Sequence, residues 1–151
     1  PGSVGGAVRM NAGIGPGQDI SAYIARARVF DPDSGEEAWL TPDEIGFSYR
    51  SSGLAKSRAI VTGAEFGLPQ PGQGPGALAS VKELFATRRA SQPKNRFTFG
   101  SVFKNPAGAP HSAGWYLERA GMIGMHCGGA LVPVEHANWI VNSGGATPAD
   151  L

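Results

Sequence analysis

Glycine most constrains what this chain can fold into, because its 23 glycines are joined by 12 prolines and follow no regular period. Such a density implies many tight turns, and many places where the backbone closely approaches another backbone or a ligand. The irregular spacing excludes a collagen-like fold, and an apolar content of 41% is enough for a hydrophobic core. The 151 residues therefore predict one ordinary domain or two small ones.

The charge and the cysteine content argue against several classes of function. The formal net charge is +1, so strong attraction to nucleic acid or to a membrane surface is not expected. No apolar run approaches the roughly 20 residues that span a bilayer, and no secretory signal pattern is visible, so a cytoplasmic protein is expected. The lone Cys127 excludes an internal disulfide and is expected to be small and buried. No metal site is predicted, because no recognised ligand spacing joins Cys127 to His111, His126 or His136.

The first half of the chain has the pattern of a short α+β segment. Residues 1–19 are glycine-rich and predict no regular core element. Apolar runs predict strands over residues 20–30, 36–40 and 59–68. The turn-forming residues 31–35 join the first two strands as a hairpin. Thr41 and Glu44 have the spacing of a capping box, which predicts the start of a short helix.

The second half follows a connector rich in proline, glycine and glutamine at residues 69–76, the best candidate for a domain boundary. Apolar residues recur at helical steps over residues 77–90, at Leu78, Val81, Leu84 and Phe85. Residues 91–100 are expected to be irregular. The remaining predicted elements are a helix at 112–120, ended by Gly121, and a short strand at 139–141. The expected fold class is α+β, in two segments spanning residues 1–69 and 77–151.

Both ends of the sequence have the pattern expected inside a longer protein. The chain opens on Pro1 inside a glycine-rich motif. It closes on residues 147–151, whose threonine, proline and acid are typical of a helix start. We therefore expect the chain to be an internal fragment of a longer protein.

Four motifs are candidates for chemistry. Residues 2–7 (GSVGGA) and 11–13 (NAG) expose backbone to a close ligand, although glycine runs are more often turns and the Rossmann spacing is missing. In residues 46–52, Arg50 lies among aromatic and hydroxyl side chains and could hold a carboxylate, although an ordinary surface arginine is the simpler interpretation. Residues 99–106 bring a serine, a lysine and an asparagine together, but Phe103 stands where a nucleophile elbow needs glycine. Residues 121–142 indicate a close-packed turn that leads into a strand.

In this order, the four motifs resemble those of UDP-N-acetylenolpyruvoylglucosamine reductases over essentially the whole chain. The run Gly100 to Pro106 is the most specific part, since it is similar to the family signature around a proton-donating serine. The resemblance implies the rear part of a vanillyl-alcohol-oxidase-type FAD-binding domain at residues 1–69. It also implies most of an α+β substrate-binding domain at residues 77–151. The residues implied are Ser101 and Arg50 as catalytic; Gly2, Ser3, Gly5, Gly6, Ala7, Asn11, Ala12 and Gly13 as cofactor-binding; and Tyr49, Arg89, Lys104 and Asn105 as substrate-binding.

The resemblance also implies a reaction. NADPH reduces FAD, which then delivers hydride to UDP-N-acetylglucosamine enolpyruvate and gives UDP-N-acetylmuramate for peptidoglycan. Arg50 would stabilise the enolate-like charge and Ser101 would protonate the neighbouring carbon. The family's pyrophosphate loop and C-terminal catalytic glutamate are absent from these 151 residues, so weak flavin binding by the isolated chain is expected. Two alternatives stay open: another FAD-linked oxidoreductase of the same fold, and an inactive fragment that binds no flavin.

Overall fold

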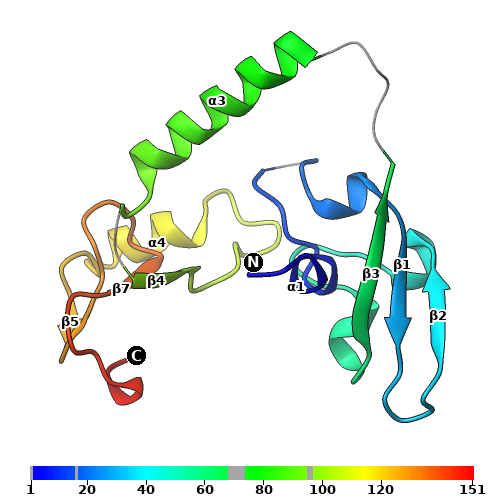
Figure 1. The fold of residues 1–151 in the computed structure, drawn as a ribbon. Helices are drawn as coiled ribbons and strands as arrows, with labels where there is room; N and C mark the ends of the chain where they lie inside the picture. Colours follow the sequence, from blue (N-terminus) through cyan, green and yellow to red (C-terminus); the bar gives the residue numbers. More distant parts are fainter. Residues whose placement is uncertain (1, 16, 68–73, 95–96) are drawn as a thin grey trace. The chain divides into compact units, whose positions relative to one another are not determined.

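The computed structural model describes residues 2–15, 17–67, 74–94 and 97–151. The chain forms two compact units, Pro1–Gly72 and Gln73–Leu151 (Figure 1). Most of the expected connector, residues 69–73, lies outside the described residues, and Gly74 to Gly76 already belong to a helix. Each unit contains helices and an antiparallel sheet, which confirms the predicted α+β class.

The N-terminal unit is built on a three-stranded antiparallel sheet in the order β2-β1-β3. Its strands are β1 (Ile24–Phe30), β2 (Glu37–Leu40) and β3 (Ile60–Phe66). The hairpin between β1 and β2 is closed by Asp31 N–H donating to Glu36 O at 2.9 Å, with Gly35 at φ 75°. The hairpin and the third strand were both predicted, because turn residues and alternation are local signals.

A helix in the first 19 residues contradicts the expectation that they lack a core element. Helix α1 (Val4–Arg9) begins at Ser3, whose side chain accepts a hydrogen bond from Gly6 N–H. Val8 is fully buried. A Cβ on Gly5 would lie 3.2 Å from the carbonyl oxygen of Val61 in β3, so this glycine allows the helix to pack close to the strand. The prediction failed because glycines that serve packing look like loop glycines in sequence.

The core of the N-terminal unit joins α1 to the sheet and to two short helical turns. Helix α2 (Pro42–Ile45) carries the predicted capping box between Thr41 and Glu44 and ends at Gly46, which has φ 62°. The 3-10 turns η1 (Ile20–Ala22) and η2 (Gly53–Lys56) complete the unit. The buried apolar side chains are Val8, Ile24, Ala27, Val29, Ile45 and Leu54.

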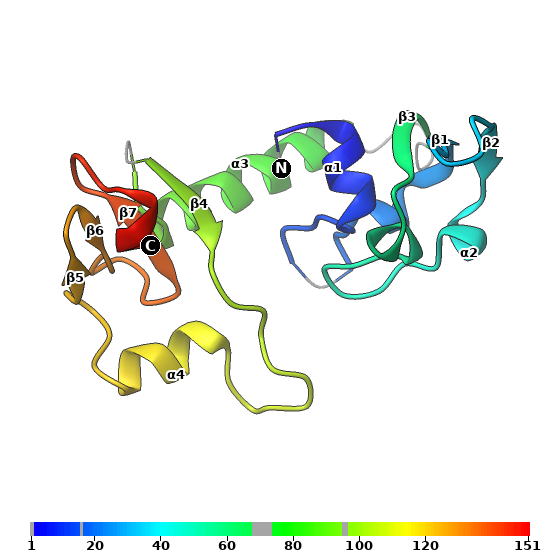
Figure 2. The same ribbon diagram turned by 90° about the horizontal axis from the view of Figure 1, so that it is seen from below.

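The C-terminal unit holds a four-stranded antiparallel sheet in the order β4-β7-β6-β5 (Figure 2). Its strands are β4 (Phe97–Ser101), β5 (His126–Cys127), β6 (Ala130–Leu131) and β7 (Trp139–Asn142). Its helices are α3 (Gly74–Ser91), α4 (Ala113–Arg119) and the 3-10 turn η3 (Pro148–Asp150). The predicted helices and the strand at 139–141 are confirmed, and α3 begins three residues earlier than expected.

Two expectations about this unit were wrong. Residues 97–101 form strand β4 rather than irregular chain, because Phe97 and Phe99 favour extended structure and β7 supplies the pairing partner. Cys127 is exposed in the short strand β5 rather than buried. Within the described parts of the chain, no helix has the length and apolar character needed to cross a membrane. No cluster of acidic, histidine or cysteine side chains suited to a metal is found among the described residues.

Burial of Val8 gives a direct test of the N-terminal core. Val8→Ala removes two buried methyl groups and should lower the free energy of unfolding of this chain by about 1.5–2.5 kcal/mol. Val4 lies in the same helix but is 56% exposed, so Val4→Ala should change that free energy by less than about 0.5 kcal/mol. Urea unfolding followed by circular dichroism measures both. Equal effects of the two substitutions would show that α1 is not docked on the sheet.

His136 gives a pH test of the C-terminal unit. Burial lowers the pKa of His136, against a smaller raising effect of the Glu118 charge, and its Nδ1 accepts a hydrogen bond from Asn138 N–H at 3.1 Å. A histidine that resists protonation when folded supports stability above the unfolded pKa of about 6.5 and loses that support as the pH falls through the lowered folded pKa. The stability difference between the chain and His136→Asn should therefore shrink from pH 7.5 to pH 5.5 in urea unfolding. An unchanged difference would contradict a lowered pKa for His136.

Candidate functional site

Arg50 lies at the tip of a tight turn in the N-terminal unit. Ser48 N–H donates to Ser51 O at 3.0 Å and Ser51 N–H donates back to Ser48 O at 3.1 Å, leaving Tyr49 and Arg50 as the turn residues. Arg50 has φ 51°, in the left-handed region that favours glycine at this turn position. Such a backbone costs on the order of 1 kcal/mol for a larger residue. The contacts of the arginine side chain must therefore offset that cost.

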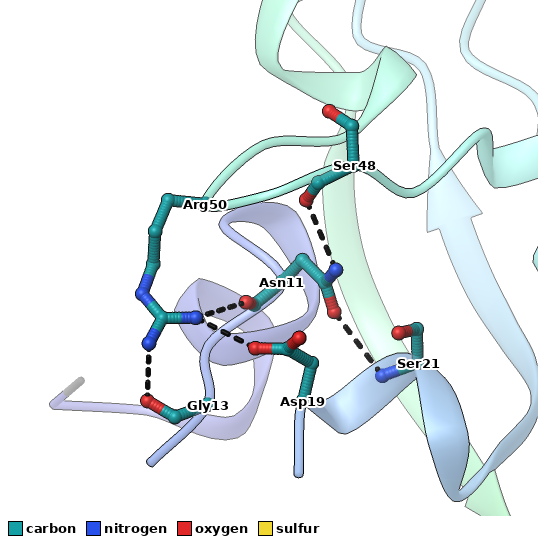
Figure 3. A network of polar contacts seen from close by, with 6 residues as sticks. All are labelled: Asn11, Gly13, Asp19, Ser21, Ser48 and Arg50. Atoms are coloured by element: carbon teal, nitrogen blue, oxygen red, sulfur yellow. Dashed lines mark hydrogen bonds and ion pairs between the residues drawn. The ribbon is translucent and has the colours of Figure 1, made fainter. Parts of the chain in front are cut away.

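The guanidinium of Arg50 connects the turn to the glycine-rich loop of residues 11–19 (Figure 3). Its Nη1 donates to the Asp19 carboxylate at 2.6 Å and to Asn11 O at 3.3 Å, while Nη2 donates to Gly13 O at 2.6 Å. Five N–H hydrogens are available on an arginine. Among the described residues, Nε–H and one Nη2–H of Arg50 have no acceptor, so two adjacent nitrogens can still bind a carboxylate.

Sequence reasoning missed Asp19. Its ion pair with Arg50 is half-buried, and the two residues are 31 positions apart. No local motif marks Asp19, because an aspartate before a helical turn is an ordinary feature. Its antiparallel bridge to Gly13 folds the loop back on itself. A Cβ on Gly13 would collide with the Asp19 side chain, so the glycine makes room for the carboxylate that holds Arg50.

Asn11 fixes the same loop from within. It is 4% exposed and has φ 44°, a conformation that asparagine tolerates better than most residues. Its Nδ2 donates to Ser48 O at 3.0 Å, and its Oδ1 accepts from Ser21 N–H at 3.2 Å (Figure 3). The structure thus places Asn11 and Gly13, two of the predicted cofactor residues, in bonds that join the loop to the Arg50 turn.

Three of the other predicted cofactor residues line a shallow cleft. Ser3, Gly5 and Gly6 face part of β3 and its approach, together with Arg9 and Arg58, across a space of about 390 Å³. A Cβ on Gly2 would meet nothing within 4 Å, and one on Gly6 would meet only the Ser3 hydroxyl oxygen. The backbone of Gly2 and Gly6 is therefore open to close approach by a flat ligand. The amides of Gly6 and Ala7 already donate to Ser3, so they are less suited to bind phosphate.

The two arginines of this cleft differ in how firmly they are held. Arg9 donates to Ala59 O at 2.8 Å and to Ser57 O at 2.7 Å, so its charge is fixed beside the backbone entering β3. Arg58 pairs with Asp33 at 2.6 Å, and both side chains are largely exposed. An exposed pair of this kind contributes little to stability. Arg58 is therefore the cation that can turn toward an anionic group in the cleft.

Ser101 ends strand β4 in the C-terminal unit. It pairs with Trp139 of β7 after an irregularity at Gly100, which has φ 91°. The Ser101 side chain is exposed, and its hydroxyl makes no hydrogen bond to a described residue. Because paired residues on neighbouring strands share a face of the sheet, Ser101 and Trp139 lie on the same face. Trp139 Nε1–H is the buried side-chain polar atom without a partner in the described structure.

Asn138 lies within the fourth motif, residues 121–142, but was not predicted as a site residue. It is 3% exposed, and its carboxamide bonds both the N–H and the C=O of Phe103, two residues after Ser101. Asn105, a predicted substrate residue, accepts from Ala113 N–H at 3.0 Å and so braces the start of α4. Lys104 lies exposed between Phe103 and Asn105. The structure therefore gathers Ser101, Lys104 and Asn105 on one segment held by Asn138.

Arg89 lies in a separate cationic cleft of the C-terminal unit. The last turn of α3 and the following residues enclose about 340 Å³, lined by Phe85, Arg88, Arg89, Gln92, Pro93 and Lys94. Three cations and an aromatic ring in one cleft can receive a phosphate beside a flat group. The predicted site residues are thus distributed between the units: Arg50, Tyr49 and the glycine loop in one, Ser101, Lys104, Asn105 and Arg89 in the other.

Comparison with known proteins finds similar sequences in one family. The model of the C-terminal domain of UDP-N-acetylenolpyruvoylglucosamine reductase matches residues 92–151. The reductase of Nostoc sp. (strain PCC 7120) is 46% identical over 152 residues, covering all of this chain and 44% of that protein. The reductase of Halalkalibacterium halodurans is 46% identical over 151 residues, covering all of this chain and 48% of that protein.

A solved structure agrees with these relatives. The crystal structure of UDP-N-acetylenolpyruvylglucosamine reductase from Thermus caldophilus superposes with a TM-score of 0.85 at 36% sequence identity. The match covers 97% of this chain and 52% of that one, so the chain spans about half the length of the relatives it matches. Both units are included in these matches, as the motifs of both halves predicted. Over residues 92–151 this chain matches the C-terminal domain of UDP-N-acetylenolpyruvoylglucosamine reductase, and over its whole length it is similar to proteins that carry that name.

Proposed function

We propose that this chain supplies the flavin-facing loop, the substrate arginine and the proton-donating serine of an NADPH-dependent reductase. The reaction would convert UDP-N-acetylglucosamine enolpyruvate to UDP-N-acetylmuramate for peptidoglycan synthesis. Residues 1–69 would form the rear part of the FAD-binding domain, and residues 77–151 most of the substrate-binding domain. The relatives that match the whole chain carry the name of this reductase.

The observation that carries the proposal is the hydrogen bonding of the Arg50 guanidinium. Its guanidinium is held by three protein oxygens, yet Nε–H and one Nη2–H remain available among the described residues. A strained turn and a carboxylate partner together hold an arginine whose donors are still unsatisfied. This arrangement supports binding of a substrate carboxylate by preorganised donors, which strengthens as enolate charge develops.

The chain's own residues supply the remaining functions. The open backbone at Gly2, Ser3 and Gly6 would contact FAD, which when bound supplies the hydride transfer between NADPH and substrate. Ser101 would give its hydroxyl proton to the carbon beside the new C–H bond, so that the O–H bond breaks and a second C–H bond forms. The Ser101 oxygen would then regain a proton from solvent, with Lys104 nearby in sequence to stabilise the alkoxide. Arg89, Lys94 and Arg88 would hold the diphosphate of the substrate in their cleft.

A chimaeric enzyme tests the function of this chain. The chain replaces the matched 151-residue segment of the Halalkalibacterium halodurans reductase, whose other segments stay unchanged. The chimaera should retain FAD, oxidise NADPH and reduce the enolpyruvyl substrate. A chimaera that holds FAD but leaves the substrate unreduced would contradict the proposal.

Ser101→Ala in this chimaera should separate the two half-reactions. Reduction of the bound flavin by NADPH should stay within about twofold, while reoxidation by the enolpyruvyl substrate should slow by roughly 10²-fold or more. Stopped-flow absorbance of the flavin measures both rates. Equal slowing of the two half-reactions would identify Ser101 as structural, and no slowing would place the proton donor elsewhere.

Arg50→Ala should lower the rate of the oxidative half-reaction by about one to two decades, because a hydrogen bond to a charged group contributes roughly 1.5–3 kcal/mol. Arg50→Lys should recover only part, since an ammonium cannot reach Asp19, Gly13 O and a ligand together as a planar fork does. Arg26→Ala is the matched control, because Arg26 has a comparable pair with Glu65 that is exposed on the sheet. An unchanged rate for Arg50→Ala, or equal losses for Arg26→Ala, would overturn the assignment.

A further inference from the structure

The backbone that follows Ser101 is held by Asn138, the residue immediately before strand β7. Val102 N–H donates to the backbone oxygen of Asn138 at 2.9 Å. Phe103 N–H donates to Asn138 Oδ1 at 2.9 Å, and Asn138 Nδ2 donates to Phe103 O at 2.8 Å. The carboxamide thus bonds both backbone groups of Phe103, as a neighbouring strand would. Asn138 therefore continues the pairing of β4 beyond its last ladder residue.

The side chain of Asn138 has little freedom to make other bonds. It is 3% exposed, and both ends of its carboxamide are occupied by Phe103. Its own N–H donates to His136 Nδ1 at 3.1 Å, which fixes the main chain that carries it. A buried amide with every position defined in this way is preorganised, because moving it would leave polar groups unpaired at about 1–3 kcal/mol each.

Ser101 itself depends on its main chain for position. Its hydroxyl has no bond to a described residue. The preceding Gly100 has φ 91° and, as a glycine, has no side chain that would restrict the backbone before Ser101. Two contacts restrain the segment: the pairing of Ser101 with Trp139 on β7, and the bonds of Asn138 to Val102 and Phe103. Removing the Asn138 carboxamide would free the backbone of Phe103 and leave the segment after Ser101 held on this side only by the bond from Val102 N–H to the Asn138 backbone.

We propose that Asn138 is a positioning residue for Ser101, which it holds in place through the backbone of Val102 and Phe103. This inference rests on the proposed function of Ser101 as proton donor. Asn138 does not touch substrate in this role; it sets where the serine hydroxyl lies. A displacement of about 1 Å at a reacting group can slow a reaction about 10²-fold, so loss of the carboxamide should affect proton transfer selectively.

Asn142, at the far end of strand β7 from Asn138, provides a matched control. Its Oδ1 accepts from Gly144 N–H at 2.9 Å and from Ala146 N–H at 3.2 Å, so Asn142→Ala also removes two bonds between a side chain and the backbone. Asn142 pairs with Phe97 at the opposite end of β4 from Ser101. The two substitutions therefore compare similar losses of hydrogen bonding at different distances along the strand from the serine.

The experiment uses the chimaeric reductase with its cofactor bound. Asn138→Ala should leave flavin reduction by NADPH within about twofold and slow reoxidation by substrate about 10- to 100-fold. Asn142→Ala should leave both half-reactions within about threefold. Asn138→Asp keeps an acceptor for Phe103 N–H but not the donor to Phe103 O, and should give an intermediate loss. It serves in place of Asn138→Ala if that variant does not fold.

A double-variant cycle decides whether Asn138 acts through Ser101. If it does, Asn138→Ala should change the oxidative half-reaction less than about threefold in a Ser101→Ala background, because the serine is no longer there to position. Full additivity of the two losses would show that Asn138 is only structural. Equal effects of Asn138→Ala and Asn142→Ala would also overturn the inference. Failure of the proposed function is separate, since it would appear as an unchanged oxidative rate for Ser101→Ala alone.

Discussion

The guanidinium of Arg50 binds the carbonyl groups of Asn11 and Gly13 and the carboxylate of Asp19 at once. The described residues of this loop, 11–15 and 17–19, form no helix or strand, so their backbone groups need partners from side chains or water. Asn138 has the same relation to the segment that follows Ser101. In a chain so rich in glycine, a few side chains that bond to distant backbone hold the irregular segments. Both candidate catalytic residues lie on segments of this kind.

Local chemistry made part of the fold predictable. The hairpin at residues 31–35 and the capping box of Thr41 and Glu44 depend on residues within five positions of one another, and the structure confirms them. Helix α1 and strand β4 were missed, because each is stabilised by a partner element far away in sequence. Exposure of Cys127 was missed for a related reason, since burial depends on which faces of β5 and β6 are covered.

For the site too, residues with a local sequence signal were predicted and residues that depend on distant partners were not. Arg50 and Ser101 were found because a family resemblance marked them, whereas Asp19 lies in none of the four motifs and Asn138, although within the fourth, was assigned no role. Asp19 is 31 residues from Arg50, and Asn138 is 35 residues from Phe103. Sequence also cannot separate glycines that face a ligand from glycines that permit packing. Gly5 and Gly13 leave no room for a side chain, while the surroundings of Gly2 are open.

The two candidate catalytic residues are restrained in different ways, and the difference suits their proposed tasks. Arg50 must hold a charged group whose charge grows during the reaction, and its own guanidinium is fixed by three oxygens. A donor fixed in advance needs little reorganisation when that charge appears. Ser101 must release its proton, and a hydroxyl committed to a protein acceptor would be a poorer donor. Restraint of Ser101 through its backbone leaves the hydroxyl free, which is why its support is expected from Asn138 rather than from a direct partner.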